Sequence, residues 1–189
     1  DGRGGADDFT IDPGVTLSGN ISGSDGDDTF VINGTVGGNL DGGDGTDTLT
    51  YTGTVTGVIS SIEIVNINGT DDIANPDQIV VSLNSVTTDL EVAITTSGFT
   101  TTQSFFPPPV APTVTINVNG LDGDDIVVID HRNGFVDGDI VLDGGNGADS
   151  LQVLDVGSVA SNLSATYTPG DSPDNGTVLL AEGDLRQLI

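Results

Sequence analysis

The chain has 189 residues, no cysteine, and 29 acidic residues against three arginines, which gives a formal net charge of -26 at pH 7. A surface with that charge repels phosphate backbones and anionic lipids, which argues against nucleic-acid binding and against a polybasic contact with a membrane. No apolar run approaches the roughly 18 residues of a membrane-spanning helix, so we expect no membrane span. Without cysteine, no disulfide can stabilise the fold.

The acidic residues are almost all aspartates, because only Glu63, Glu91 and Glu182 are glutamates. The short aspartate side chain suits tight turns and close contact with a cation, whereas a generally solvated acidic surface would contain many glutamates. Disorder is the alternative for so charged a chain, but its hydrophobic content of 35 % falls in short β-branched runs. We therefore expect a fold that forms when cations neutralise the turns.

One nine-residue pattern, G-G-x-G-x-D-x-U-x with U a large apolar residue, organises the chain. Nonapeptides 1 to 5 are GRGGADDFT at 2–10, GSDGDDTFV at 23–31, GGDGTDTLT at 42–50, GLDGDDIVV at 120–128 and GGNGADSLQ at 144–152. Numbers 3 and 5 match completely, and the others depart at the second position, with Arg3, Ser24 and Leu121. Glycine permits the positive φ of a tight bend, aspartate adds an anionic oxygen, and U begins a strand whose side chain enters a core.

The spacing of the nonapeptides predicts the fold class. Within the two groups they start 21, 19 and 24 residues apart. At about 3.3 Å per strand residue, this period suits one coil of a parallel β-solenoid, either a β-roll or a β-helix. Bends stacked in this way would lie roughly 4.8 Å apart, close enough for two of them to share one ion. The sequence therefore predicts an all-β fold with stacked bends.

The middle of the chain departs from the pattern. Residues 59–67 alternate in polarity and lead to a degenerate coil that ends in Asp77-Gln78-Ile79, which keeps only the D-x-U ending. Residues 90–94 and 99–106 predict a β-hairpin, followed by a packed loop or edge cover at 107–109. A closing hairpin is predicted at 165–167 and 178–181. We divide the chain into a first solenoid unit at 1–51, a degenerate coil with the hairpin insertion at 52–112, and a second unit at 113–189.

The chemistry of the bends points to a hard cation. Aspartate and carbonyl oxygens suit Ca²⁺, whereas zinc and copper prefer thiolate and imidazole, and the chain has no cysteine and one histidine. His131 has no nucleophile placed beside it by any motif, and aspartate pairs such as Asp27-Asp28 alternate between opposite faces. We therefore predict that the chain is not an enzyme.

The five nonapeptides resemble the calcium-binding repeats of RTX, or haemolysin-type, proteins. The resemblance implies that sixth-position aspartates and bend carbonyls of successive repeats bind Ca²⁺. Carried to this chain, the sixth-position candidates are Asp7, Asp28, Asp47, Asp125 and Asp149. The carbonyl candidates are Gly5, Gly26, Gly45, Gly123 and Gly147. Third-position candidates are Asp25, Asp44, Asp122 and Asn146.

The chain differs from that family in spacing. The family's repeats follow one another every nine residues and place ions along both edges, whereas these copies lie about two repeat lengths apart. We therefore expect ions along one edge only, between nonapeptides 1 and 2, 2 and 3, and 4 and 5.

Two functions are carried forward from these expectations. The first is a calcium-stabilised structural or adhesive repeat unit of a secreted bacterial surface protein or extracellular filament, located at the cell surface and stacking with further copies. The alternative is a non-catalytic calcium-binding module of a secreted RTX-type enzyme. A carbohydrate-binding face is a third hypothesis, for which 4 % aromatic residues provide few stacking platforms.

Overall fold

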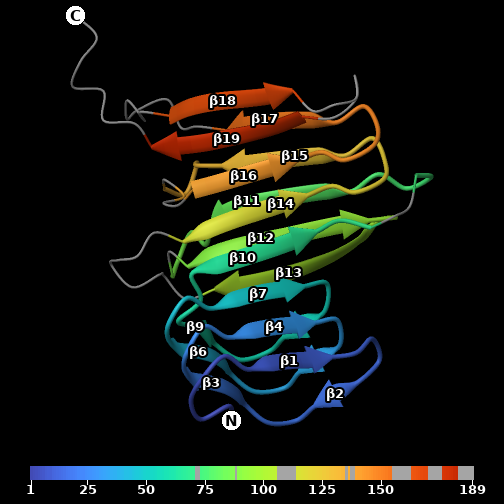
Figure 1. Ribbon diagram of the computed structural model, residues 1–189. Coiled ribbons are helices and arrows are strands. Elements are labelled where there is room, and N and C mark those ends of the chain that lie inside the picture. Colours follow the sequence, from blue (N-terminus) through green and yellow to red (C-terminus); the bar gives the residue numbers. More distant parts are fainter. Residues whose placement is uncertain are drawn as a thin grey trace, which may run out of the picture.

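The protein is a stack of short parallel strands closed by two antiparallel hairpins (Figure 1). This computed structural model describes residues 1–70, 73–87, 89–105, 114–134, 136 and 139–154, together with the backbone of 163–169 and 176–182. The described residues form strands, bends and turns but no helix, and therefore no helix that could cross a membrane. The predicted all-β parallel solenoid is confirmed.

The first three coils each contribute to three parallel sheets. The large sheet starts with β1 (Asp8–Ile11), β4 (Thr29–Ile32), β7 (Thr48–Tyr51) and β10 (Ile64–Asn68). A small sheet contains β2 (Thr16–Leu17), β5 (Thr35–Val36) and β8 (Thr54–Val55). Another contains β3 (Ile21–Asp25), β6 (Leu40–Asp44) and β9 (Ile59–Ser60). Each strand pairs in register with its counterpart one coil away, as the 21- and 19-residue spacing predicts.

Beyond β10 the coils are built from two sheets. The large sheet continues with β14 (Thr115–Asn119) and β16 (Asp139–Asp143), both parallel to β10. The second sheet contains β11 (Gln78–Leu83), β15 (Ile126–Asp130) and β17 (Ser150–Leu154), which are also parallel. The large sheet therefore runs through all three segments of the chain and joins them.

Both predicted hairpins are confirmed. β12 (Leu90–Thr96) and β13 (Phe99–Phe105) are antiparallel and extend the second sheet, while β18 (Leu163–Pro169) and β19 (Gly176–Glu182) pair at the far end of the large sheet. β13 also contacts β8 and β9, and the Val55 amide donates a hydrogen bond of 2.9 Å to Gln103 Oε1. The first hairpin thus covers the small sheets. The loop predicted at 107–109 lies outside the described residues.

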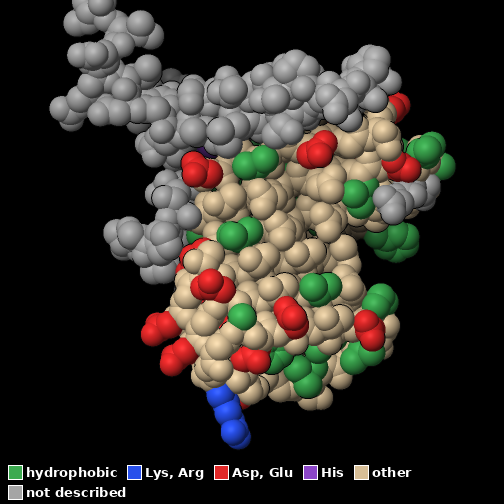
Figure 2. Space-filling model, in the orientation of Figure 1, with side chains coloured by type: hydrophobic (Ala, Val, Ile, Leu, Met, Phe, Trp, Pro, Cys, Tyr) green, Lys and Arg blue, Asp and Glu red, His purple; other side chains and the backbone are tan. Residues whose placement is uncertain are grey.

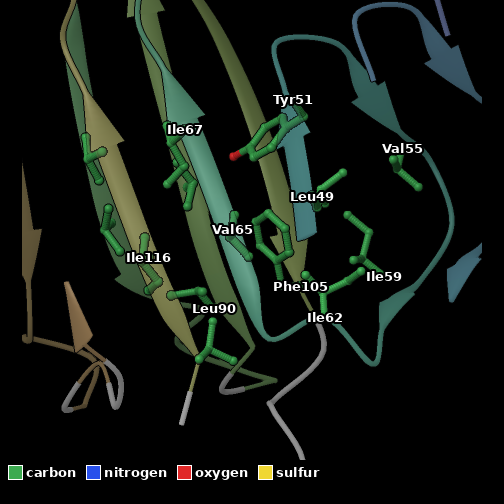
Figure 3. Close-up of a cluster of buried hydrophobic side chains, with 14 of the residues drawn as sticks. Leu49, Tyr51, Val55, Ile59, Ile62, Val65, Ile67, Leu90, Phe105 and Ile116 are labelled. Atoms are coloured by element: carbon green, nitrogen blue, oxygen red, sulfur yellow. The ribbon is translucent and has the colours of Figure 1, made fainter. Parts of the chain in front are cut away.

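The core consists of the apolar residues that alternate along the strands. Phe30, Leu49 and Val127, at the eighth position of their nonapeptides, are buried as predicted, and Phe9 and Leu151 are half-buried. The rings of Phe9 and Phe30 stack with their centroids 5.1 Å apart. Figure 3 shows the core where the hairpin meets the first coils, with side chains of the large sheet facing Phe105. Each coil therefore adds one layer to a continuous hydrophobic column.

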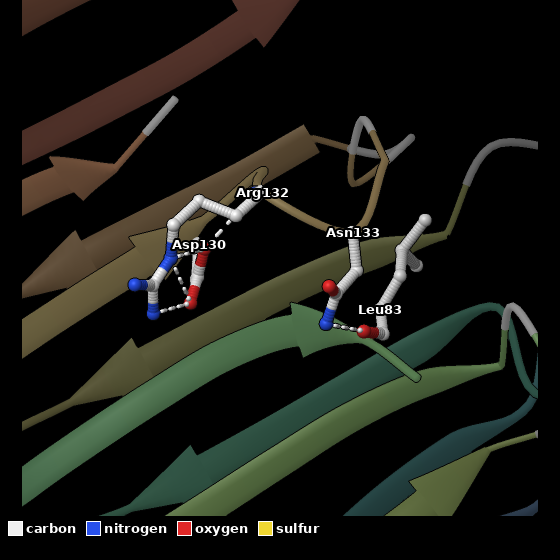
Figure 4. Close-up of polar contacts among 4 residues, drawn as sticks. All are labelled: Leu83, Asp130, Arg132 and Asn133. Carbon is white, nitrogen blue, oxygen red and sulfur yellow. Dashed lines mark hydrogen bonds and ion pairs between the residues drawn. The ribbon is translucent and has the colours of Figure 1, made fainter. Parts of the chain in front are cut away.

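The loop after β15 is fixed by polar contacts at the surface (Figure 4). Arg132 forms an ion pair of 2.6 Å with Asp130, and the guanidinium lowers the pKa of that carboxyl. The Asn133 side chain donates to the Leu83 carbonyl at 3.0 Å. His131 is buried, and its Nδ1 accepts a hydrogen bond of 3.1 Å from the Val136 amide. These contacts give His131 a role in shaping the loop.

The second position of each nonapeptide has positive φ even where it is not glycine. Gly43 has a φ of 111°, and the in-register Ser24 has a φ of 85°. A left-handed backbone costs an L-residue about 1–2 kcal/mol relative to glycine. The departures from the pattern therefore carry strain that glycine in nonapeptides 3 and 5 avoids.

The substitutions Ser24→Gly and Gly43→Ser test this strain in opposite directions. Ser24→Gly should raise the free energy of unfolding by about 1 kcal/mol, because it removes the left-handed penalty. Gly43→Ser should lower it, because a Cβ at this position would overlap the Ser24 carbonyl. Chemical denaturation of both variants measures the effect. Equal stabilities for the two variants would contradict it.

Candidate metal sites at two rows of buried aspartates

The bends lie at opposite edges of the large sheet, one edge being formed by the starts of its strands and the other by their ends. Nonapeptides 1, 2 and 3 place their aspartates directly before β1, β4 and β7, whereas nonapeptides 4 and 5 follow β14 and β16. Since these strands are parallel, the first group lies where the strands begin and the second where they end (Figure 1). The expectation that a single edge carries the bends is wrong. The change occurs at β10, which follows Glu63 at the first edge and precedes the bend that leads to Asp77 at the second.

The first aspartate row consists of Asp7, Asp28, Asp47 and Glu63, one from each successive coil. The Asp7 amide donates to Asp28 Oδ1 at 2.8 Å, and the Asp28 amide donates to Asp47 Oδ1 at 2.9 Å. The Asp47 amide continues the row by donating to Glu63 Oε2 at 2.8 Å. Three of the four carboxylates, those of Asp28, Asp47 and Glu63, therefore accept a main-chain hydrogen bond from the coil before them.

The second aspartate row consists of Asp77, Asp125 and Asp149 and repeats the same contact. The Asp77 amide donates to Asp125 Oδ1 at 2.7 Å, and the Asp125 amide donates to Asp149 Oδ1 at 2.9 Å. Asp77 also accepts hydrogen bonds from the hydroxyls of Thr70 and Thr96. The degenerate coil thus supplies a full member of the row, with threonine hydroxyls as additional donors.

One oxygen of most of these carboxylates has no hydrogen bond. Among the described residues, the Oδ2 atoms of Asp7, Asp28, Asp47 and Asp125 are buried without a partner. Asp28, Asp47 and Asp125 are at most 1 % exposed. An unsatisfied buried polar atom costs about 1–3 kcal/mol, and more when it is charged. The unpartnered oxygens of the rows are therefore unfavourable for folding unless a proton or a cation binds to them.

The orphaned oxygens lie beside carbonyls of the next coil. A Cβ added to Gly23 would overlap both Asp28 Oδ2 and the Gly42 carbonyl, and a Cβ on Gly120 would overlap Asp125 Oδ2 and the Gly144 carbonyl. The first-position glycines thus leave room where a carboxylate and a carbonyl from adjacent coils converge. Oxygens of these two kinds are the ligands that Ca²⁺ prefers. The residues present therefore fit a hard cation.

Carboxylates alone do not complete such a site. No group of three or more histidine, cysteine or acidic side chains among the described residues could hold a metal ion. Bend carbonyls would have to supply the remaining ligands. Gly26 and Gly45, at the fourth position, have φ values of 124° and 147°, which confirms the left-handed bends expected there. Gly5, Gly123 and Gly147 have positive φ as well.

The third-position side chains lie outside the rows. Asp25 and Asp44 are exposed and in register with each other, and their carbonyls accept the amides of Gly5 and Gly26. In the second group Asn146 Nδ2 donates to Asp122 Oδ1 at 2.7 Å. Figure 2 shows acidic side chains gathered beside the first three bends, at the left of its lower half. Metal binding by the third position remains a prediction.

Sequence reasoning placed Asp77 in a degenerate coil without nominating it as a site residue, and it missed Glu63. Both keep the acidic-x-apolar ending of the nonapeptide, in Glu63-Ile64-Val65 and Asp77-Gln78-Ile79, but lack its glycines. A search for an acidic-x-apolar ending would also have found Glu63. The hydroxyl of Thr96 on Asp77 comes from the inserted hairpin and leaves no signal near the bend.

Burial raises the pKa of Asp47, Asp125 and Asp149, and neighbouring carboxylates add to the effect. A folded-state pKa above the unfolded value stabilises the fold fully below the unfolded pKa, and this stability is lost as the pH rises through the folded pKa. Without metal, the protein should therefore melt at a higher temperature near pH 5 than near pH 8. Thermal melts in chelator across this range measure it, and a higher melting temperature at pH 8 would contradict it.

Gly23→Ala tests the room between adjacent bends. The added methyl would overlap Asp28 Oδ2 and the Gly42 carbonyl, so we expect a loss of about 2 kcal/mol or more in the free energy of unfolding. Gly19→Ala is the matched control, because a Cβ there meets no atom within 4 Å. Chemical denaturation should separate the two variants clearly. Similar stabilities would show that the bends have space to spare.

Comparison of the chain with protein-family models, with curated proteins and with solved structures gives no match in any of the three. The resemblance to haemolysin-type repeats therefore depends on the nonapeptide residues themselves. The two aspartate rows provide the geometry from which a function can be inferred.

Proposed function

We propose that the protein is a calcium-stabilised structural or adhesive repeat unit of a secreted bacterial surface protein or extracellular filament. The observation that carries the proposal is the orphaned Oδ2 of Asp28, Asp47 and Asp125, each buried beside a carbonyl of the next coil. When bound there, Ca²⁺ would supply the positive charge that offsets repulsion between stacked carboxylates. The chain contributes oxygens already held in two rows by main-chain hydrogen bonds.

The expected stabilisation is large for a domain of this size. Extracellular calcium modules bind with dissociation constants of about 10⁻⁴–10⁻³ M, and an ion at ten times that concentration stabilises by about 1.4 kcal/mol. Three ions, between nonapeptides 1 and 2, 2 and 3, and 4 and 5, would together contribute about 4 kcal/mol. Domain stabilities are about 5–15 kcal/mol, so folding would depend strongly on calcium. This dependence favours an extracellular location, where calcium is plentiful.

The free edge of the large sheet supports a role in assembly. Among the described strands, β1 pairs only with β4, so its other edge presents unpaired main-chain groups. Such an edge is a template for another parallel strand. Self-association, or stacking with further copies, would continue the first aspartate row beyond Asp7. The same bends would serve the alternative function, a non-catalytic calcium-binding module of a secreted RTX-type enzyme. The full-length gene distinguishes the two functions by encoding either further repeats or a catalytic domain.

Calcium removal tests the proposal. At saturating calcium the wild-type protein should melt about 10 °C higher than in chelator, which corresponds to about 4 kcal/mol in a chain of this length. Mg²⁺ should substitute poorly because it dehydrates reluctantly. Differential scanning calorimetry with each ion measures the shift. A melting temperature that is the same in calcium and in chelator would disprove the proposal.

The substitution Asp47→Asn tests whether the first aspartate row produces the calcium-induced rise in melting temperature. Asparagine keeps an oxygen that can accept the Asp28 amide, but it removes the charge that would bind the ion. The calcium-induced shift should fall by about a third or more, while stability in chelator should be equal or higher because repulsion is relieved. Asp8→Asn is the matched control, since Asp8 is exposed on β1 and changes the net charge equally. Equal shifts in both variants would place the ions elsewhere.

A further inference from the structure

A hollow of about 180 Å³ lies between the ends of β7 and β10 and the tip of the β12–β13 hairpin. We call it the hairpin hollow, and the residues that matter for its chemistry are Tyr51, Asn68, Thr70, Thr96, Phe99 and Thr101. It is separate from the orphaned oxygens of both aspartate rows. Its lining comes from the solenoid on one side and from the inserted hairpin on the other.

The hollow exists because the hairpin is longer than the core that it covers. Leu90 pairs with Phe105 near one end of the hairpin, and Thr96 pairs with Phe99 at the other, so all four lie on the same face of the two strands. Leu90 and Phe105 are each 5 % exposed, whereas Phe99 is 82 % exposed. The face that packs in the core therefore continues past it and presents an aromatic ring to solvent.

Tyr51 lines the hollow and carries an unsatisfied polar group. It is 3 % exposed, and its hydroxyl has no hydrogen-bond partner among the described residues. Its ring lies edge-on to Phe105 with centroids 5.6 Å apart, and Figure 3 shows its oxygen directed away from Leu49, toward the side of Ile67. Burial raises the pKa of this hydroxyl, so it stays protonated and can donate. A buried tyrosine hydroxyl normally has a partner.

Apart from Ile94 and two glycines, the rest of the lining is polar but uncharged. Thr70 and Thr96 donate their hydroxyl protons to Asp77, which leaves their oxygens able to accept. Thr101 adds a third hydroxyl, and Asn68 adds an amide that both donates and accepts. No lysine or arginine lines the hollow to bind an anion, and the chain's charge of -26 repels one. The lining therefore fits a neutral ligand with many hydroxyls.

A second hollow, of about 360 Å³, adjoins the first through Asn68. It lies on the outer side of the large sheet, where Asn117 Nδ2 donates to Asn66 Oδ1 at 2.8 Å and Asn66 Nδ2 donates to Thr50 Oγ1 at 3.0 Å. This row of amides also has both donors and acceptors.

We infer that the hairpin hollow is a saccharide-binding site, with the exposed ring of Phe99 packing against one face of a neutral pyranose and the Tyr51 hydroxyl, Asn68 and the threonines binding its hydroxyls. A pyranose combines a face of C–H groups with a rim of hydroxyls, which matches one aromatic ring opposite several neutral polar groups. The volume suits a single sugar ring better than a drug-sized ligand, whose pockets are about 300–1,000 Å³. The site goes beyond calcium stabilisation and does not depend on it.

The test uses the full chain in calcium and four probes: the methyl glycosides of glucose, galactose and mannose, and N-acetylglucosamine. Saturation-transfer NMR identifies a bound probe, and isothermal titration calorimetry measures its affinity. At least one probe should bind with a dissociation constant of about 1 mM or tighter. Phe99→Ala and Tyr51→Phe should each weaken it at least about tenfold, which corresponds to one lost contact of about 1.4 kcal/mol.

Controls separate loss of the site from loss of the fold. Tyr51→Phe removes only an unpartnered hydroxyl, so its melting temperature should equal or exceed that of the wild type. Val86→Ala changes another exposed apolar residue of the inserted segment, outside the hollow, and should bind as the wild type does. Absence of binding by all four probes overturns the inference, as does binding that both Phe99→Ala and Tyr51→Phe leave unchanged. Either outcome leaves the calcium dependence of the melt unaffected, so the two proposals fail independently.

Discussion

The main constraint on the structure is that carboxylates of successive coils lie one above another at the spacing of β-strands, where their charges repel. Asp28 and Asp47 come from adjacent coils, and a main-chain hydrogen bond holds each carboxylate against its neighbour. That bond satisfies Oδ1 but not Oδ2, which is buried. Repulsion between such groups increases as water is excluded, because the effective dielectric constant falls. Neutralisation by protons or cations would relieve this repulsion.

The glycines of the nonapeptides are the counterpart of this constraint. At the first position they leave space between coils, since a Cβ on Gly23 or Gly120 would overlap both a carboxylate and a carbonyl. At the fourth position, as in Gly26 and Gly45, they provide the positive φ that reverses the chain. Strands on either side then bury the apolar residues that alternate along them. Turn, ligand and core are therefore encoded together, and a change in one disturbs the others.

Much of this was predictable because the information is local. The eighth-position residues, the left-handed glycines and the two hairpins follow from short patterns. The position of the bends on two edges does not, because it depends on β10 having Glu63 of the first row before it and the bend to Asp77 of the second row after it. Glu63 and Asp77 keep the ending of the nonapeptide but not its glycines, so the full pattern passes over them. The hairpin hollow depends on how far Phe99 extends beyond a core formed by other segments.

The position of β10, where the coils change from three sheets to two, has a mechanical consequence. Before β10 each coil contributes strands to the large sheet and to two small sheets. After β10 the coils contribute to the large sheet and to the second sheet. Among the described strands, only the large sheet contains members from both sides of this change. Tension along the stack would pass from one half to the other through the β7–β10 ladder, assisted by the contact of β13 with β8 and β9. Under tension the stack would yield first at this junction, with the bends on either side still intact.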